Sequence, residues 1–415
     1  MTSDHVISAP WLASPATQAI FAALEGGGYT ARAVGGIVRN TLLGLPATDI
    51  DIATNALPAE TIRLAMAAGL KTIATGLAHG TVTIIAHGIP FEVTTLRRDV
   101  ETDGRHAQVA FTDNWAVDAA RRDFTINALY CSRDGRVFDP LGGVADLHPV
   151  KVRFIGSAGE RICEDYLRIL RFFRFTATYC ADGVADGDGL AACIVHRDGL
   201  ARISGERIQS ELLKLLAAPQ AVGVTKVLVD SGVFSALFDQ RPQFEVFSRL
   251  AAIETGLKRS ADPLLRFAAL AVQTAADVAA FDRRLKFSAR DRNRLAHAVT
   301  NQTGIDAGLS FDDAKRAAYG MGIPGYRDAV LLNWASGDRH LDDAAFAQLV
   351  SLPERWTPPV FPLSGGDVRA LGIPAGPEIG VLLARIEADW IAGGFAADRA
   401  ALLAVLHERV AGRTG

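Results

Sequence analysis

Two aspartates separated by a single residue are the first candidates for chemistry in this chain. They are Asp49 and Asp51, in the run Thr48-Asp49-Ile50-Asp51-Ile52. Alternate side chains of a strand share a face, so we expect both carboxylates to point the same way while the isoleucines face the core. Two adjacent carboxylates repel each other unless a cation lies between them. Mg²⁺ takes such oxygen ligands together with substrate phosphates, and two ions would activate an attacking hydroxyl and stabilise a leaving pyrophosphate.

A glycine turn and an arginine precede this pair. Gly35 and Gly36 suit a turn whose backbone approaches a phosphate closely, and Arg39 would add a charged fork. Taken alone, a Gly-Gly pair is more often a plain turn, and an Asp-x-Asp run is more often solvated. The aspartate pair begins thirteen positions after Gly36, and it is the combination that favours phosphoryl chemistry.

The elements that must position these residues change character along the chain. Short β-branched runs lie at 31–34, 50–52, 81–86 and 91–95, and helical patterns separate some of them. After about residue 157 the period is almost entirely helical, with examples at 162–177, 205–217 and 221–229, while the Gly/Asp-rich segment 181–189 is expected to be a loop. The sequence therefore predicts an α+β chain. We expect it to be mixed α/β over about the first 150 residues and helical over the remainder.

Composition narrows the class of protein. The 415 residues include 43 basic and 46 acidic ones, so any nucleic-acid contact must come from local patches and not from the overall field. No secretory signal opens the chain, and the most apolar stretch, Leu264 to Val272, is interrupted by Arg266 and too short to span a bilayer. We therefore expect no membrane partner and a cytoplasmic location. Reduced cysteines without metal-ligand spacing fit this expectation: Cys131, Cys163, Cys180 and Cys193.

Five motifs in order carry a resemblance to a known family. The pattern GGxVR…DxDxxT, at 35–39 and 49–54, resembles class II CCA-adding tRNA nucleotidyltransferases and bacterial poly(A) polymerases, of the DNA polymerase β-like superfamily. The resemblance is strong over about residues 25 to 220. Where the family usually has Asp after the motif arginine, this chain has Asn40. The remaining motifs are Arg121–Ala128, Asp139–Gly143 with Asp146 and Leu147, Glu164–Arg168, and Ser204–Ile208.

The resemblance implies an enzyme that adds C, C and A to the tRNA 3′ end from CTP and ATP, without a nucleic-acid template and with Mg²⁺. It implies that Asp49 and Asp51 are catalytic and hold the metal. It further implies a catalytic head (1–150), a neck (151–220), a body (221–352) and a tail (353–415), and that the tail and the other helical parts bind tRNA. The nucleotide-binding residues implied are Gly36, Arg39 and Arg122 for the triphosphate, Asp123 and Asn127 for the ribose, and Asp165 and Arg168 for the base; Gly35 and Arg121 also bind the nucleotide, and Arg171 and Arg174 extend the stripe.

The base-reading motif has its own physical logic. Asp165 and Arg168, three apart on a predicted helix, would project from one side. A carboxylate and a guanidinium together match the amino donor and ring-nitrogen acceptor that C and A share, and oppose G and U. The alternative is an ordinary solvated helix face with a Glu164–Arg168 ion pair. Segment 151–175 holds six basic and three acidic residues, a local positive patch.

Several alternatives stay open at this stage. Glu92 is either a third metal-binding carboxylate on an adjacent strand or the partner of Arg97 or Arg98 in a salt bridge. The polar segment 98–111 resembles the family's flexible loop, and a generic surface loop would look the same. The rival functions are a poly(A) polymerase of the same fold and, from another class, a non-catalytic tRNA-binding protein. Segment 75–83 looks like the CCA-adding version, and the sequence leaves the oligomeric state open.

Overall fold

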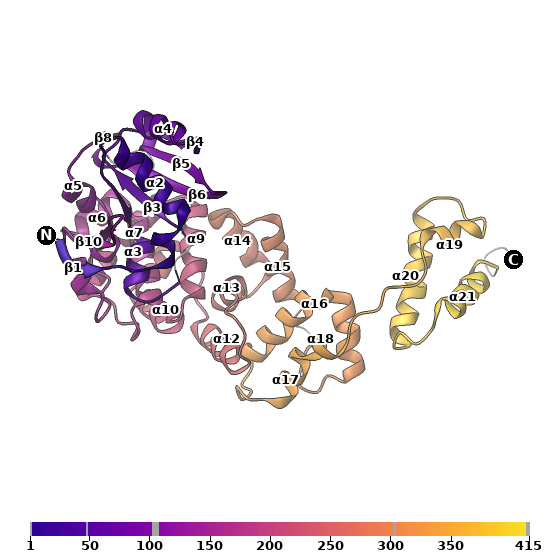
Figure 1. Ribbon diagram of the computed structural model, residues 1–415. Helices are drawn as coiled ribbons and strands as arrows, with labels where there is room; N and C mark the ends of the chain where they lie inside the picture. The colour runs from indigo at the N-terminus through magenta and orange to yellow at the C-terminus, as the bar shows by residue number, and fades with distance from the viewer. Residues whose placement is uncertain (1, 47–48, 102–107, 302–303, 412–415) are drawn as a thin grey trace. The chain divides into compact units, whose positions relative to one another are not determined.

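The computed structural model describes residues 2–46, 49–101, 108–301 and 304–411 (Figure 1). The chain forms two compact units. The first comprises Met1–Pro242 with Arg284–Lys286, and the second comprises Gln243–Arg283 with Phe287–Gly415. The finer division into head, neck, body and tail remains a prediction.

The first unit contains a mixed β-sheet. Within the described residues it has eight strands in the order β1-β10-β9-β2-β3-β6-β5-β4. Neighbouring strands are antiparallel except β3 and β6, which run parallel. The strands are β1 (Thr2–Val6), β2 (Ala31–Val34), β3 (Asp51–Thr54), β4 (Lys71–Gly76), β5 (Thr81–Ala86), β6 (Ile89–Thr95), β9 (Tyr130–Cys131) and β10 (Arg136–Phe138).

Alternation along the strands decides which face of this sheet is covered. In β5, Val82, Ile84 and Ala86 are buried while the residues between them are half-buried. Helices α2 (Pro15–Gly26) and α4 (Pro58–Ala67) pack against this strand (Figure 1). The apolar stripe of α2 therefore closes the core of the head on that side.

A second, two-stranded sheet contains β7 (Arg97–Glu101) and β8 (Gln108–Phe111). Apart from Arg97, it lies within the segment 98–111 that resembles the family's flexible loop. Residues 102–107 fall outside the described residues, so the loop's proposed role stays a prediction.

Helices make up the rest of the first unit. They are α1 (Pro10–Ala13), α3 (Gly36–Leu42), α5 (Trp115–Ala120), α6 (Ala158–Glu164), α7 (Leu167–Tyr179), α8 (Gly187–His196), α9 (Gly205–Ala217), α10 (Ala221–Asp230) and α11 (Val233–Leu237). Four short 3-10 turns connect these elements: η1 (Leu77–His79), η2 (Thr125–Asn127), η3 (Gly143–Asp146) and η4 (Arg197–Arg202). The predicted helix at 205–217 has the bounds found for α9.

Two of the predicted boundaries are wrong. The helix expected at 162–177 is two helices, because Asp165 has extended backbone (φ −153°, ψ 101°) between α6 and α7. The adjacent Tyr166 ring packs so closely on Gly199 that a Cβ there would lie 2.0 Å from it, a tertiary contact that no helical period reveals. The loop expected at 181–189 is also shorter, since α8 already begins at Gly187. The Asp186 carboxylate caps that helix by accepting from the Gly189 N–H at 2.9 Å.

A short return of the chain completes the first unit. The Arg284 guanidinium donates to the carbonyls of Leu200 and Ile203, at 2.9 and 3.0 Å. A Cβ on Gly205 would lie 1.9 Å from the Arg284 carbonyl oxygen, so glycine is needed for this close approach. Residues 284–286 therefore fold with the first unit although the chain on both sides belongs to the second.

The described part of the second unit is helical and contains a buried ion pair and a partly exposed ionic cluster. The Glu254 carboxylate accepts from Arg266 at 2.6 Å, with both side chains less than one-tenth exposed. Arg294 joins Asp262 and the buried Asp328, and the side chains of Arg294 and Asp262 are each about one-third exposed. The helices are α12 (Phe244–Gly256), α13 (Pro263–Ala271), α14 (Ala275–Leu285), α15 (Ala289–Thr300), α16 (Phe311–Ser336), α17 (Ala344–Val350), α18 (Leu352–Arg355), α19 (Gly365–Ala370), α20 (Pro377–Ala392) and α21 (Arg399–Ala411).

The predicted α+β fold class is confirmed. Helices α19, α20 and α21 share a core in which Leu382, Ile386 and Trp390 pack against Leu402 and Leu406.

Among the described residues no single helix is long and apolar enough to cross a membrane. Only α13 and α14 taken together, across a bend of 117°, meet that length and composition.

Candidate active site

The glycine turn connects β2 to α3. Gly35 has φ +75°, a conformation that side-chain-bearing residues rarely adopt, and its N–H donates to the Leu129 carbonyl at 3.0 Å. Helix α3 begins at the next residue, Gly36. The predicted turn is present and brings backbone close to the segment that follows Arg121, while its predicted approach to a phosphate remains a prediction.

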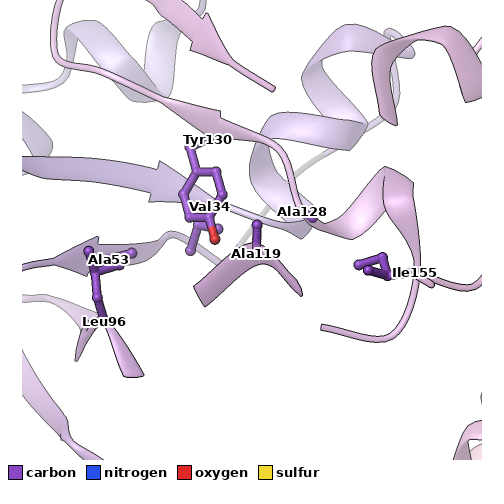
Figure 2. Close-up of a cluster of buried hydrophobic side chains, with 7 residues drawn as sticks. All are labelled: Val34, Ala53, Leu96, Ala119, Ala128, Tyr130 and Ile155. Atoms are coloured by element: carbon purple, nitrogen blue, oxygen red, sulfur yellow. The ribbon is translucent and has the colours of Figure 1, made fainter. Parts of the chain in front are cut away.

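A buried apolar cluster joins the segments that carry the site (Figure 2). Val34 lies just before the glycine turn, and Ala53 lies two residues after Asp51. The remaining members come from other segments that lead to or from predicted site residues. The cluster comprises Val34, Ala53, Leu96, Ala119, Ala128, Tyr130 and Ile155. Packing of these side chains fixes the relative positions of turn, strand and arginine motif.

The carboxylates meet at the start of β3. Asp51 is the first residue of that strand, and its register partner in the parallel strand β6 is Glu92. Asp49 precedes the strand, so the expectation that both aspartates alternate within one strand is wrong. The enclosing protein, then the negative charges of Glu92 and Asp49, raise the pKa of Asp51, while Arg122 opposes this. Such an accumulation of oxygen ligands fits a hard divalent cation.

Among the described residues, no three or more histidine, cysteine, aspartate or glutamate side chains are grouped so that they could hold a metal ion. Glu92 lies beside Asp51 by register, and Arg97, one of its two predicted ion-pair partners, donates to the carbonyl of His79. A metal here would need substrate oxygens to complete its coordination, which is the usual arrangement for Mg²⁺ with phosphates.

A pocket of about 390 Å³ collects most of the predicted nucleotide-binding residues. Asp49, Glu92 and Arg174 are the predicted residues that do not line it, and Phe175 is a lining residue that the sequence did not single out. The lining residues are Gly35, Gly36, Arg39, Asp51, Arg121, Arg122, Asp123, Asn127, Asp165, Arg168, Arg171 and Phe175. Segments up to 140 residues apart in the chain thus share one cavity.

Arg39 is buried at the base of this pocket and is held by other protein groups. Its Nη1 donates to Asn127 Oδ1, and its Nη2 donates to Tyr179 Oη at 2.5 Å. Its Nε and Nη2 both donate to Asn40 Oδ1, at 3.1 and 2.8 Å. A guanidinium has five N–H groups, so these four bonds leave one for a substrate oxygen.

A hydrogen-bonded chain continues from Arg39 through the middle of the pocket. Asn127 Nδ2 donates to Asp123 Oδ1 at 2.9 Å. Arg171 donates to Asp123 Oδ2 through both Nε and Nη2, at 2.7 and 2.5 Å. Burial disfavours the Asp123 charge, but Arg171 and Asn127 outweigh it and lower the pKa of that carboxyl. Glu211 of α9 accepts from Arg174 and lies 3.8 Å from Arg171.

The two motif arginines share one buried carboxylate. Asp118 Oδ1 accepts from Arg121 Nε at 2.9 Å, and Oδ2 accepts from Arg122 Nη2 at 3.2 Å and from the Tyr130 hydroxyl at 2.8 Å. Burial opposes the charge of Asp118, yet Arg122 and Arg121 together lower its pKa. Both arginines are thereby oriented towards the pocket that they line.

Asp165 and Arg168 both line the pocket, but they do not share a helix as predicted. Arg168 lies on α7, and Asp165 lies in the break before it. Asp165 Oδ2 accepts from Arg207 Nη2 at 2.6 Å. Arg168 donates to Glu164 Oε2 at 2.6 Å, so the ion pair expected of a solvated face exists as well. Arg168 also donates to the Arg121 carbonyl at 3.1 Å, which ties α7 to the arginine motif. The ion pair and a base-facing role are therefore compatible.

Known proteins match this chain over most of its length. The model of the "Poly A polymerase head domain" matches residues 31–153, and that of the "Probable RNA and SrmB- binding site of polymerase A" matches residues 188–247. CCA tRNA nucleotidyltransferase 1, mitochondrial, of Mus musculus is 36% identical over 91% of this chain and 86% of its own length. This chain belongs to the CCA-adding tRNA nucleotidyltransferase family.

Further relatives of this family agree in length and in fold. The CCA-adding enzyme of Levilactobacillus brevis is 33% identical over 98% of this chain and all of its own. The crystal structure of the Bacillus stearothermophilus CCA-adding enzyme in complex with CTP has 26% identity and a TM-score of 0.71, and the match covers 97% of this chain and 99% of that one. The family is thus one of nucleotidyltransferases, whose members generally use divalent metal ions.

Sequence reasoning missed the residues that hold the pocket's side chains. Asp118 stands three positions before Arg121, at helical spacing, but an isolated aspartate gave no reason to choose it. Tyr179 and Glu211 lie outside every recognised motif. Arg207 lies inside one, and its pairing with the base-reading motif becomes visible only in the fold.

Proposed function

We propose that this protein adds C, C and A to the 3′ end of tRNA, using CTP and ATP and no nucleic-acid template. The tRNA 3′-hydroxyl attacks the α-phosphate of the nucleotide, and pyrophosphate leaves. The observation that carries the proposal is the single pocket lined by Asp51, by the motif arginines and by the pair Asp165 and Arg168. One cavity thus offers metal-binding, phosphate-binding and base-facing groups together.

Mg²⁺ is the proposed cofactor, with Asp49 and Asp51 as its ligands and Glu92 as a possible third group. When bound, it supplies charge stabilisation to the attacking and leaving oxygens. The raised pKa of Asp51 fits this assignment, because burial, and after it the negative charges of Glu92 and Asp49, disfavour its charged form where a bound cation would favour it.

Phosphate and ribose binding is assigned to the middle of the pocket. Arg121 and Arg122, oriented by Asp118, face the triphosphate together with the backbone of Gly35 and Gly36. Arg39 contributes its one remaining N–H. Asp123 and Asn127 would bind the ribose, and Arg171 orients Asp123 for this role. Arg174 does not line the pocket, and through Glu211 it supports the position of Arg171.

Base selection is assigned to Asp165 and Arg168. A carboxylate acceptor and a guanidinium donor match the amino group and ring nitrogen that C and A have in common. Arg207 donates to Oδ2 of Asp165, and among the described residues Oδ1 accepts only from the Leu167 N–H at 3.1 Å, so Oδ1 keeps acceptor capacity for the amino group of a base. The local geometry therefore supports a fixed fork.

The decisive experiment determines the sequence of the products. A tRNA lacking its CCA end is incubated with CTP, with ATP or with both, and the added nucleotides are read on a sequencing gel. Ordered addition of two C and one A is expected. A run of A from ATP alone would identify a poly(A) polymerase, which shares the matched head model. No incorporation would identify a non-catalytic tRNA-binding protein.

The cytoplasm is the proposed location. All four cysteines are free thiols, as expected in a reducing compartment. Recovery of the native protein in the soluble cytoplasmic fraction of its cells is expected, and enrichment in an organelle or membrane fraction would contradict it.

A further inference from the structure

Asn40, the residue where the family usually has aspartate, makes two kinds of hydrogen bond at once. Its Oδ1 accepts from Arg39 Nε and Nη2, at 3.1 and 2.8 Å. Its Nδ2 donates to the Pro46 carbonyl oxygen at 2.8 Å. Asn40 therefore connects the arginine beneath the pocket to the chain segment that follows α3.

An aspartate could reproduce only half of this arrangement. A carboxylate accepts hydrogen bonds and, when ionised, donates none. Its second oxygen would face the Pro46 carbonyl oxygen at the distance of a hydrogen bond with no proton between them. Two acceptors in that position repel each other, so the segment at Pro46 would lose its anchor.

The charge of Arg39 gives a second reason. Its burial disfavours the charged form and lowers its pKa, and Tyr179 and Asp123 oppose that lowering only in part. Asn40 holds the guanidinium without adding a negative charge. The field of Arg39 at the pocket is therefore not cancelled by the residue that orients it.

We propose that Asn40 is a positioning residue for nucleotide binding, which acts through Arg39, and that aspartate cannot replace it in this chain. The inference rests on the proposed function of the pocket. Asn40 orients Arg39 for the phosphate and anchors the chain at Pro46, and both effects concern binding of the nucleotide more than the chemical step.

The test compares Asn40→Asp with Asn114→Asp. Asn114 caps α5, where its Oδ1 only accepts, from Ala116 and Val117 N–H groups, and aspartate caps a helix equally well. We expect Asn40→Asp to raise KM for both CTP and ATP by about tenfold, from the loss of a hydrogen bond and the added charge, with a smaller change in kcat. The Asn114→Asp control should keep the wild-type KM.

A KM within about twofold of wild type in a folded Asn40→Asp protein would overturn the proposal. Should that variant fail to fold, Asn40→Ala removes the same bonds without a charge, and its KM must also rise. An unchanged KM in folded Asn40→Ala would overturn the proposal as well. If the wild-type protein itself adds no nucleotide, the proposed function fails. Direct binding of CTP by equilibrium dialysis then still tests Asn40, since the affinity for CTP must fall in Asn40→Asp and must not fall in Asn114→Asp.

Discussion

Arg207 Nη2 donates to Asp165 Oδ2 at 2.6 Å, so a residue of α9 holds one of the two side chains that we propose to select the base. Asp165 lies in the break between α6 and α7, where the start of α7 holds it: the Arg168 N–H donates to its carbonyl at 2.9 Å, and the Leu167 N–H donates to its Oδ1 at 3.1 Å. The ion pair with Arg207 restrains its other carboxylate oxygen. The precision of base selection should therefore depend on a residue that need not touch the nucleotide.

Arg207→Ala should reduce discrimination against UTP and GTP by roughly tenfold, the low end expected when a charged hydrogen bond is lost. The measurement is kcat/KM for all four nucleotides. Lys226→Ala is a suitable control, because Lys226 forms an ion pair with Asp230 in which both side chains are exposed to solvent. Nucleotide ratios equal to wild type in Arg207→Ala would show that the ion pair has no part in selection.

Arg168→Ala should lower discrimination by roughly ten- to a hundredfold if Arg168 reads the base. This variant also loses the ion pair with Glu164, so Glu164→Gln is needed beside it. That second change weakens the pair and keeps the guanidinium, and it should leave the nucleotide ratios nearly intact. Equal ratios in both variants and in wild type would favour the simple solvated helix face. Asp165→Ala should behave like Arg168→Ala.

Asp51→Asn should reduce nucleotide incorporation by more than about a hundredfold, since one oxygen ligand is lost where transition-state charge is greatest. The amide has the same shape, so folding and tRNA binding should persist. Incorporation of labelled CTP is measured over a range of Mg²⁺ concentrations. A rate within about tenfold of wild type, about 1.4 kcal/mol of barrier, would contradict the metal assignment.

Asp118 should make the stability of the protein depend on acid pH. Although burial opposes it, the paired Arg122 and Arg121 lower the pKa of Asp118 below its ordinary value of 3.8. A depressed carboxyl pKa contributes stability above the ordinary value, and that stability is lost as the pH falls through the folded-state value. Asp118→Asn should therefore be less stable than wild type near neutral pH, and the gap should narrow below about pH 4. Urea denaturation at several pH values measures it, and a constant gap would count against the linkage.

Arg266→Ala should destabilise the second unit by about 3–5 kcal/mol, because it leaves the Glu254 charge buried without its partner. Arg409→Ala offers a comparison, since its pair with Asp389 lies at the surface and should contribute under about 1 kcal/mol. Urea denaturation followed by circular dichroism compares the two. Similar losses in both variants would mean that water reaches the inner pair.

The periods of the sequence predicted the fold class, and the motifs that resemble the family, with the arginines that extend one of them, included eleven of the twelve residues that line the pocket. Gly35 adopts the positive φ that its residue type suggests, and α9 has its predicted bounds. The break at Asp165 could not be predicted, since the sequence shows the same helical period on both sides of it. The contact between Tyr166, in the break, and Gly199 is a tertiary contact that the sequence does not reveal. The hydrogen bond from Arg39 to Tyr179 could not be predicted either, because the two residues are 140 positions apart in the chain.

Residues 284–286 fold with the first unit, with Arg284 bound to the carbonyls of Leu200 and Ile203. Neither unit can therefore be excised by a single cut in the gene. A fragment ending at Pro242 would lack the segment that approaches Gly205, and the complementary fragment would carry it without its binding surface. A deletion that separates the first unit from the second must therefore preserve residues 284–286 together with the first unit.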